Sequence, residues 1–337
     1  MSITYDHKQA LLAQIELLYQ DGDLFKVIDL LENNELDFEL CLQLVRTYIN
    51  VARQSGDPYT LLDKAQTLLD NFAKLGHDNA AFQFYQGCIL FDKGLISDSA
   101  IRFEHGLKFV QAGDEKLLRH LLTYLEITKK LQKISEFKGC AQDQKEFLLD
   151  FYKTHFGEEI LEFDRVSTVS LYVIKSNEKY DYNMLVTIGL SGKDQIDSEG
   201  NSSDFELCFP LVKDFSSNDL SHEPFEISMY KEIIENIIYQ DNFIGFGYCF
   251  EREQSFSKLT AFNGVMLCSI GDHPIEEQSV NFQGRTINFL QMLPLRPMEL
   301  NYRQSHSAFE LLDLFKQKQQ ALTPFIKTRD DVCSNII

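Results

Sequence analysis

Apolar residues in the first 135 positions recur at intervals of three and four. Leu11 and Ile15 follow this spacing near the start of the chain, and Leu61 and Ala65 follow it again further on. Residues spaced in this way lie on one face of a helix. The pattern therefore predicts a series of helices in this region, each with one buried face.

A pattern centred on glycine occurs three times in the helical region. Its members share offsets of four, five and four residues: Leu18-Gly22-Val27-Leu31, Ala52-Gly56-Leu61-Ala65 and Leu90-Gly94-Ser99-Phe103. Glycine readily adopts the left-handed conformation that ends a helix. Each unit therefore predicts a helix, a turn and a second helix.

The third unit resembles a tetratricopeptide repeat, a family whose period is 34 residues. The resemblance is carried by the segment YQGCILFDKGLISDSAIRFEHGL, in which Gly87, Gly94, Ser99 and Phe103 occupy the family's glycine, small and aromatic positions. It implies an all-α domain of tetratricopeptide-like helical hairpins over residues 1–135. An ordinary helical bundle is the alternative, and the two differ because a repeat array leaves a concave face open to a partner.

From about residue 160 the apolar pattern changes to a period of two. In the segment DFELCFPL, residues 204–211, apolar side chains alternate with Asp204, Glu206 and two further residues. Alternation of this kind is typical of a strand in a sheet with one buried face. The second half of the chain is therefore expected to be rich in strands.

Two helical stripes interrupt the strand-rich half, near residues 227–239 and 308–315. Strands followed by helices in this order predict an α+β domain, in which helices pack on a mostly antiparallel sheet. The polar stretch 133–146 is the expected boundary. We expect this second domain to span residues 140–325 and to be followed by a loosely held tail at 326–337.

The charge of the chain narrows the choice of partners. Among 337 residues, 32 are Lys or Arg and 51 are Asp or Glu, so the formal net charge is −19. Nucleic acid and anionic membrane surfaces repel a chain of this sign, so neither is expected as a partner. A basic protein is the partner that this charge would attract.

Cysteine usage and hydropathy favour a cytoplasmic protein. The seven cysteines are odd in number and widely spaced, and no CxxC occurs. This usage favours a reducing compartment over a disulfide framework. The N-terminal residues show no basic start followed by an apolar stretch, so no signal peptide is predicted. No run approaches the ~20 apolar residues that cross a bilayer.

The sequence lacks several common catalytic motifs. GxSxG, HExxH and GxxxxGK are all absent, and no two of the eight histidines lie three to five residues apart. We therefore predict no catalytic residues, no metal site and no cofactor, and expect that the protein is not an enzyme. A nucleophilic Cys–His pair that meets only in space stays open.

The candidate interaction feature is an acidic loop, SGKDQIDSEGNSSD, which shows no apolar period. Its acidic residues, with one more on the adjoining strand, are the predicted partner-binding residues: Asp194, Asp197, Glu199, Asp204 and Glu206. Carboxylates clustered on a loop can pair with Arg or Lys of a basic partner and raise the association rate. A solvated loop with ordinary surface acids is the alternative.

Ordered segments of the second half resemble the suppressor of fused domain. In chain order they are HFGEEI, SLYVIKSNEKYDYNMLVTIGLSG, FELCFPL, YKEIIENIIYQ, FIGFG, LTAFNGVML, TINFLQMLPLRPMEL and AFELLDLF. Within the second segment, Thr187, Gly189, Leu190 and Ser191 resemble the family's strand-and-turn signature. The resemblance covers about residues 150–320 and implies an α/β sandwich with a mostly antiparallel sheet.

The resemblance also implies a function. The family is known as a protein-binding module that in animals sequesters a transcription factor, and its bacterial members resemble immunity proteins that neutralise toxins. The leading hypothesis is therefore a cytoplasmic, bacterial immunity protein that binds and inhibits a cognate toxin. The alternative is an adaptor that uses the helical repeats as a scaffold and the second domain for regulation.

Glu299 and Leu300, after Pro297, are interpreted as fold determinants.

Overall fold

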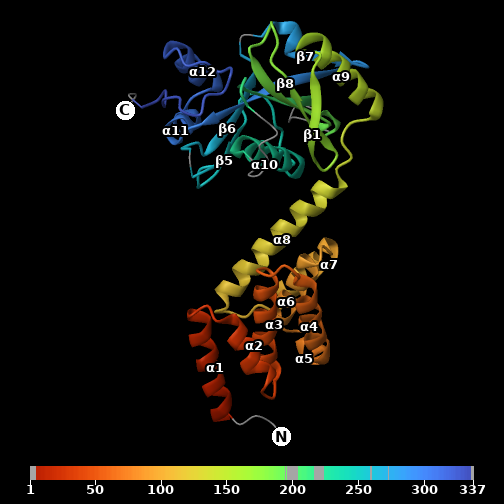
Figure 1. Cartoon of the computed structure of the whole chain (residues 1–337), viewed down its shortest axis with the longest axis vertical. Helices are drawn as coiled ribbons and strands as arrows, with labels where there is room; N and C mark the ends of the chain where they lie inside the picture. Colours follow the sequence, from red (N-terminus) through yellow and green to blue (C-terminus); the bar gives the residue numbers. More distant parts are fainter. Residues whose placement is uncertain are drawn as a thin grey trace. The chain divides into compact units, whose positions relative to one another are not determined.

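The computed structural model describes residues 5–193, 195, 204–215, 224–258, 260–271 and 273–334. The chain divides into two compact units, Met1–Lys133 and Ile134–Ile337. We call the first the helical unit and the second the sheet unit, and Figure 1 draws the elements of each. The α+β fold class predicted from the sequence is confirmed.

The described part of the helical unit is built from helices alone. They are α1 (Tyr5–Gln20), α2 (Leu24–Glu32), α3 (Phe38–Ala52), α4 (Pro58–Asn71), α5 (Ala73–Gly76), α6 (Ala80–Asp92), α7 (Ile96–Leu107) and α8 (Glu115–Glu136). The apolar faces predicted from the sequence meet in one core that includes Ile15, Leu31, Leu44, Ala65 and Phe103. Burial of these faces stabilises helices that are individually short.

Each of the three glycine-centred patterns forms a helix, a turn and a second helix. The turns lie between α1 and α2, between α3 and α4, and between α6 and α7. Gly22 and Gly94 both have φ of +77°, a conformation that a residue with a Cβ rarely adopts. Gly56 is outside this left-handed region. The hairpins are therefore present, and their relation to the tetratricopeptide family stays a prediction.

The described residues of the sheet unit form an eight-stranded sheet with helices around it. The elements are α9 (Gln142–His155), β1 (Ile160–Val166), β2 (Val169–Ile174), β3 (Tyr182–Ile188), η1 (Leu190–Gly192), β4 (Asp204–Val212), α10 (Phe225–Tyr239), β5 (Cys249–Glu251), β6 (Gly264–Ser269), η2 (Ile275–Glu277), β7 (Ser279–Phe282), β8 (Arg285–Leu295), α11 (Pro297–Ser305) and α12 (Ala308–Gln317). The strand order is β1-β2-β3-β4-β8-β6-β5, and β7 pairs with β8. Neighbours pair antiparallel except β4 and β8, which are parallel. The predicted mostly antiparallel sheet is confirmed.

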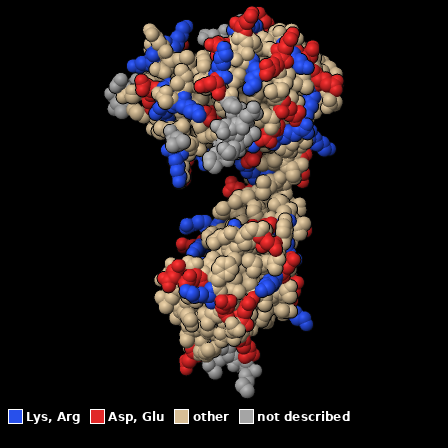
Figure 2. Space-filling view, viewed as in Figure 1, with Lys and Arg blue, Asp and Glu red and all other residues tan. Residues whose placement is uncertain are grey.

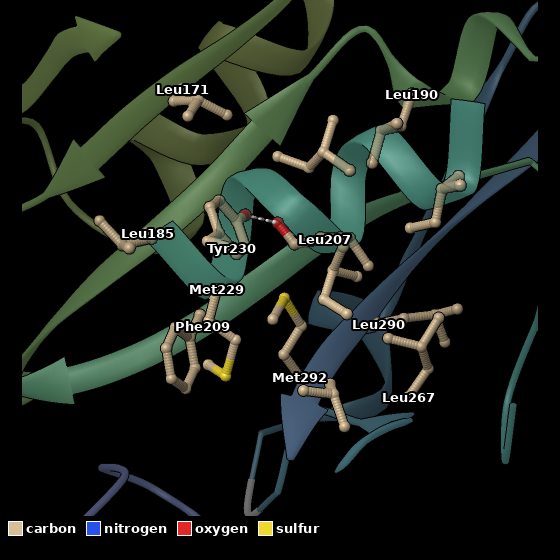
Figure 3. Packing of buried hydrophobic residues seen from close by; sticks show 14 of the residues in the cluster. Leu171, Leu185, Leu190, Leu207, Phe209, Met229, Tyr230, Leu267, Leu290 and Met292 are labelled. Carbon is tan, nitrogen blue, oxygen red and sulfur yellow. Dashed lines mark hydrogen bonds between the residues drawn. The ribbon is translucent and has the colours of Figure 1, made fainter. Parts of the chain in front are cut away.

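One face of the sheet packs against α10. Leu185, Leu207 and Phe209 project from β3 and β4 toward the buried side of this helix, as Figure 3 shows. The Tyr230 hydroxyl donates a hydrogen bond of 2.8 Å to the Leu207 carbonyl, which satisfies the one polar atom of a ring inserted into this core.

The opposite face of the sheet is also covered. At one end, Tyr152 and Phe156, in and just after α9, pack on Cys208 of β4 and Phe289 of β8. At the other end, α11 and α12 pack on β6 and the end of β8. The sequence predicts a strand with a single buried face for residues 204–211, whereas the structure buries both faces of β4 because helices lie on each.

Buried side chains occur within residues 326–334, part of the stretch 326–337 for which the sequence predicts a loosely held tail. Val332 and Cys333 are buried, and the Arg329 side chain is enclosed with them. The physical reason is an ion pair between Arg329 and the buried Glu299 of α11. Across the described residues, no helix combines the length and the apolar character that a membrane span requires.

Candidate functional site

The predicted acidic loop divides into two parts. Asp194, Asp197 and Glu199 lie outside the described residues. Asp204 and Glu206 stand at the start of β4, on the sheet face opposite α10, and are 2% and 0% exposed. The structure therefore places two of the five predicted carboxylates inside the fold, and their role toward a partner stays a prediction.

Five donors surround the Glu206 carboxylate. The backbone N–H groups of Gly189 and Ser191 donate to Oε1 at 2.9 and 3.0 Å, and the Ser191 hydroxyl donates to the same oxygen at 2.6 Å. The Thr187 hydroxyl and the Leu190 N–H donate to Oε2 at 2.7 and 3.2 Å. The residues of the strand-and-turn signature thus supply the hydrogen-bond donors of one buried acid of the same chain.

The turn around this carboxylate depends on glycine. Gly189 has φ of +130°, and a Cβ there would lie 3.2 Å from the Thr168 carbonyl oxygen and from the Val169 Cα. This backbone directs three successive N–H groups at Glu206, an arrangement that binds anions. The Gln144 side chain of α9 donates to the Ser191 hydroxyl at 2.8 Å and ties the helix to the same turn.

Burial and hydrogen bonding act in opposite directions on Glu206. Burial raises the pKa of Glu206 above its ordinary value, and the hydrogen bonds from Ser191 and Thr187 oppose this rise. Because the carboxylate accepts bonds from η1, β3 and their turn, its main effect is to hold these elements against β4. Glu206 is therefore a structural residue of the isolated chain.

Asp204 is held by an arginine of the neighbouring strand. Arg285 of β8 donates through two guanidinium nitrogens, one to each carboxylate oxygen, and both distances are 2.8 Å. Bidentate pairs of this kind are geometrically specific as well as strong. The pair fastens the first residue of β4 to β8, with which β4 runs parallel.

The other end of the acidic segment is held against α10. The Lys193 ammonium donates to the carbonyl oxygens of Ile237 and Gln240, at the C-terminal end of that helix. A cation is favourable there because the last carbonyls of a helix lack intrahelical donors. The Gln195 side-chain oxygen accepts a 2.8 Å hydrogen bond from the Ile244 N–H.

Together, Lys193, Gln195, Asp204 and Glu206 form what we call the loop base. These residues lie on either side of the undescribed positions 196–203, and each bonds to a different part of the sheet unit. The loop base therefore holds both ends of the acidic segment. Figure 2 shows acidic and basic side chains intermixed over both units on the face that it draws.

Glu299 and Arg329 form a second enclosed pair. Glu299 is fully buried and accepts from both terminal guanidinium nitrogens of Arg329, at 2.5 and 2.6 Å. It also accepts from the N–H groups of Arg296 and Val332. The interpretation of Glu299 as a fold determinant agrees with this geometry. Sequence reasoning missed Arg329, because no local pattern relates it to an acid 30 residues earlier.

A polar network around His273 was also missed. The His273 Nδ1 lies 2.9 Å from the Glu277 carboxylate, and the Tyr182 hydroxyl bonds to the other ring nitrogen. Glu277 also accepts from the Tyr180 hydroxyl and the Lys179 ammonium. Against burial, these hydrogen bonds hold the pKa of Glu277 below its ordinary value. The network links the start of β3 to η2 and connects residues nearly 100 positions apart.

The described residues contain no group of three or more His, Cys, Asp or Glu side chains arranged to hold a metal ion. The cysteines are all free, and five of the seven are buried. Burial raises the pKa of the Cys88 thiol to about 12 and that of the Cys268 thiol to about 12. These two thiols are protonated at neutral pH.

Residues 165–324 match the family model of the suppressor of fused protein (SUFU). The match spans just under half of the chain and lies within the sheet unit. It includes the Thr187–Ser191 turn, Glu206 and Glu299. The resemblance stated from the ordered segments is confirmed over these residues. No curated protein matches the chain.

Several solved structures are similar to this chain. One is described as the Sufu-Fu complex, with 14% identity, coverage of 56% of this chain and 92% of that chain, and a TM-score of 0.43. A SUFU homolog from Neisseria gonorrhoeae FA 1090 has 14% identity, coverage of 57% and 98%, and a TM-score of 0.43. Drosophila Suppressor of Fused has 16% identity, coverage of 49% and 42%, and a TM-score of 0.37. All three TM-scores lie below 0.5, so the relation to the family rests on the matched residues 165–324 alone.

Proposed function

We propose that this chain is a member of the suppressor of fused family that acts by binding a protein partner through its sheet unit. The observation that carries the proposal is the family match over residues 165–324. The loop base supports it, because an acidic segment whose two ends are held in place loses less conformational freedom on binding.

The specific partner we propose is a basic protein toxin, which the chain neutralises as a bacterial immunity protein in the cytoplasm. The charge of −19 supports a basic partner, since opposite net charges speed encounter. We expect Asp194, Asp197 and Glu199, which lie outside the described residues, to meet the partner first. Asp204 and Glu206 would contribute by holding the end of the acidic segment at the start of β4.

The immunity role is tested in cells. If it holds, a toxin gene lies beside the gene for this chain, and co-expression of the two restores growth that the toxin alone abolishes. A neighbouring gene product that neither binds the purified full chain nor is neutralised by it would contradict the immunity role. Capture of some other protein partner would leave the family-level proposal standing.

The acidic segment is tested by neutralising its charges in the full chain. The variant Asp194→Asn/Asp197→Asn/Glu199→Gln should associate with a captured basic partner about ten-fold more slowly at low salt. A matched control removes three exposed acids of the helical unit, Glu16, Asp21 and Asp70. Equal slowing by both variants would show that only total charge matters, and would remove the loop from the proposal.

An adaptor is the second candidate, favoured by the separate core of the helical unit. In this reading the helical unit makes the main contact and the sheet unit regulates it. Variants of the two units in the full chain discriminate the readings. Partner binding lost on changing helical-unit surface residues, and retained in the acidic-segment variant, would favour the adaptor.

A further inference from the structure

The helical unit contains a hollow of about 540 Å³ between α3, α6 and α8. We call it the α3–α6–α8 groove. The α3 residues that line it include Arg46, Asn50 and Arg53, and the α6 residues include Phe84 and Cys88. Spacings of three, four and seven place such residues on one face of each helix. The groove is therefore formed by regular helix faces, and its volume falls in the range of ligand pockets.

The charge of this groove is opposite to that of the chain. Its lining residues include three permanent cations, Arg46, Arg53 and Lys116, and a single carboxylate, Asp114. Residues 1–135 as a whole hold 14 basic and 19 acidic residues. The groove therefore has an excess of basic residues, whereas the other residues of 1–135 include 11 basic and 18 acidic ones.

Two of the three cations have no ion pair among the described residues. Arg53 is paired with Asp92 at 2.8 Å. Arg46 is half-buried, and its guanidinium lies over the Tyr19 ring at 4.5 Å, an interaction that leaves its N–H donors free for an anion. Lys116 is exposed at the start of α8. Arg46 and Lys116 are therefore available to carboxylates of a ligand.

The floor of the groove is aromatic. Phe84 and Tyr124 meet edge to face with centroids 5.6 Å apart, and His120 stacks on Phe84 at 5.9 Å. Leu117 of α8 completes the apolar lining. An apolar side chain fits such a floor, so the groove combines a site for a hydrophobic residue with cations beside it.

We propose that the α3–α6–α8 groove binds a linear acidic peptide segment of a second protein. One apolar side chain of the peptide lies on the Phe84–Tyr124 floor, and flanking Glu or Asp carboxylates pair with Arg46 and Lys116. Charge complementarity selects this occupant over a basic one. The site is separate from the proposed function of the sheet unit and takes a ligand of the opposite charge.

The test uses the full chain and a fluorescent octapeptide of six glutamates and two central leucines. We expect saturable binding by anisotropy at low salt that weakens as salt is added, since exposed charge pairs are screened. A matched peptide with glutamines in place of the glutamates should bind much more weakly. Arg46→Gln and Lys116→Gln should each weaken binding about five-fold, the effect expected of one charge pair.

The control variant is Arg119→Gln, which removes an exposed cation of the same helix that does not line the groove. It should bind the acidic peptide as the parent chain does, and circular dichroism should show that all variants are folded. Equal binding by the parent chain and the Arg46→Gln/Lys116→Gln double variant would overturn the proposal. Absence of saturable binding at low salt would do the same.

Two further arms separate this proposal from others. A single-stranded oligonucleotide that binds through Arg46 and Lys116, where the peptide does not, would assign the groove to nucleic acid and overturn the proposal. The acidic-segment variant of the sheet unit should leave peptide binding unchanged. Failure of the groove and failure of the proposed partner binding can therefore be told apart.

Discussion

Two buried acids of the sheet unit and two groove cations of the helical unit differ in whether the chain itself supplies their partners. In the sheet unit, Glu206 and Glu299 are buried and enclosed by donors from several elements. In the helical unit, Arg46 and Lys116 line an open groove and have no carboxylate partner among the described residues. A charge whose partners lie within the chain stabilises the fold. A charge without a partner among the described residues is available to a ligand.

The largest effect is expected where an enclosed pair is broken. Arg329→Ala leaves Glu299 buried without its counterion, so we expect a loss of about 3–5 kcal/mol in the free energy of unfolding. Urea unfolding followed by circular dichroism measures it. The control Lys318→Ala, at an exposed position of the same C-terminal region, should change stability by less than about 0.5 kcal/mol. Similar losses for both variants would contradict a stabilising role of the Arg329–Glu299 pair.

A smaller loss is expected at the loop base. Glu206→Ala leaves buried N–H and hydroxyl donors of the Thr187–Ser191 turn without an acceptor, at a cost of about 2–3 kcal/mol. Glu206→Gln retains one carbonyl oxygen and should lose less. Thermal unfolding of the two variants ranks them, and an alanine variant as stable as the parent chain would contradict the role of this carboxylate.

The Glu277 network should make the free energy of unfolding depend on pH. Because the pKa of Glu277 is lowered in the folded chain, its contribution is present above its ordinary value of 4.5 and is lost as pH falls below it. Unfolding free energies measured from pH 6 downward should therefore decline less steeply for Glu277→Gln than for the parent chain. Parallel profiles would show that this carboxylate does not contribute.

The smallest effect on the free energy of unfolding is expected where an exposed charge has no ion-pair partner among the described residues. Lys116→Gln should change the unfolding free energy by no more than about 0.5 kcal/mol, since Lys116 is exposed and forms no ion pair among the described residues. Urea unfolding again measures it. A clear loss of stability would place Lys116 among the structural charges and would weaken the contrast between the two units.

Much of the fold could be predicted from local patterns. Apolar residues change from a spacing of three and four to a spacing of two, and this change showed where helices give way to strands. The glycine-centred pattern, which occurs three times, predicted the turns at Gly22 and Gly94. Both periods arise from backbone geometry, so they are visible in any stretch of a few residues. The segment 325–334 was not predicted as packed, because Arg329 meets Glu299 only through the tertiary fold.

The candidate site shows the same division. The Thr187–Ser191 turn and Glu206 were both singled out, the first as a family signature and the second as an acid on the strand that adjoins the acidic loop. The hydrogen bonds between this turn and Glu206 could not be inferred from the sequence. The turn begins at the end of β3 and Glu206 lies on β4, and the register between these strands is set only when the chain folds. Two of the acids predicted to bind a partner, Asp204 and Glu206, therefore lie inside the fold, and their role toward a partner stays a prediction.

The sequence by itself determined that side chains of β4 alternate between two sides, because successive residues of any strand point in opposite directions. Only the tertiary structure decided what would lie on the second side. Helix α9 packs on that side, and Asp204 and Glu206, which face it, are buried and are satisfied by donors from within the chain. Burial depends on which elements meet, and that depends on contacts between residues far apart in sequence.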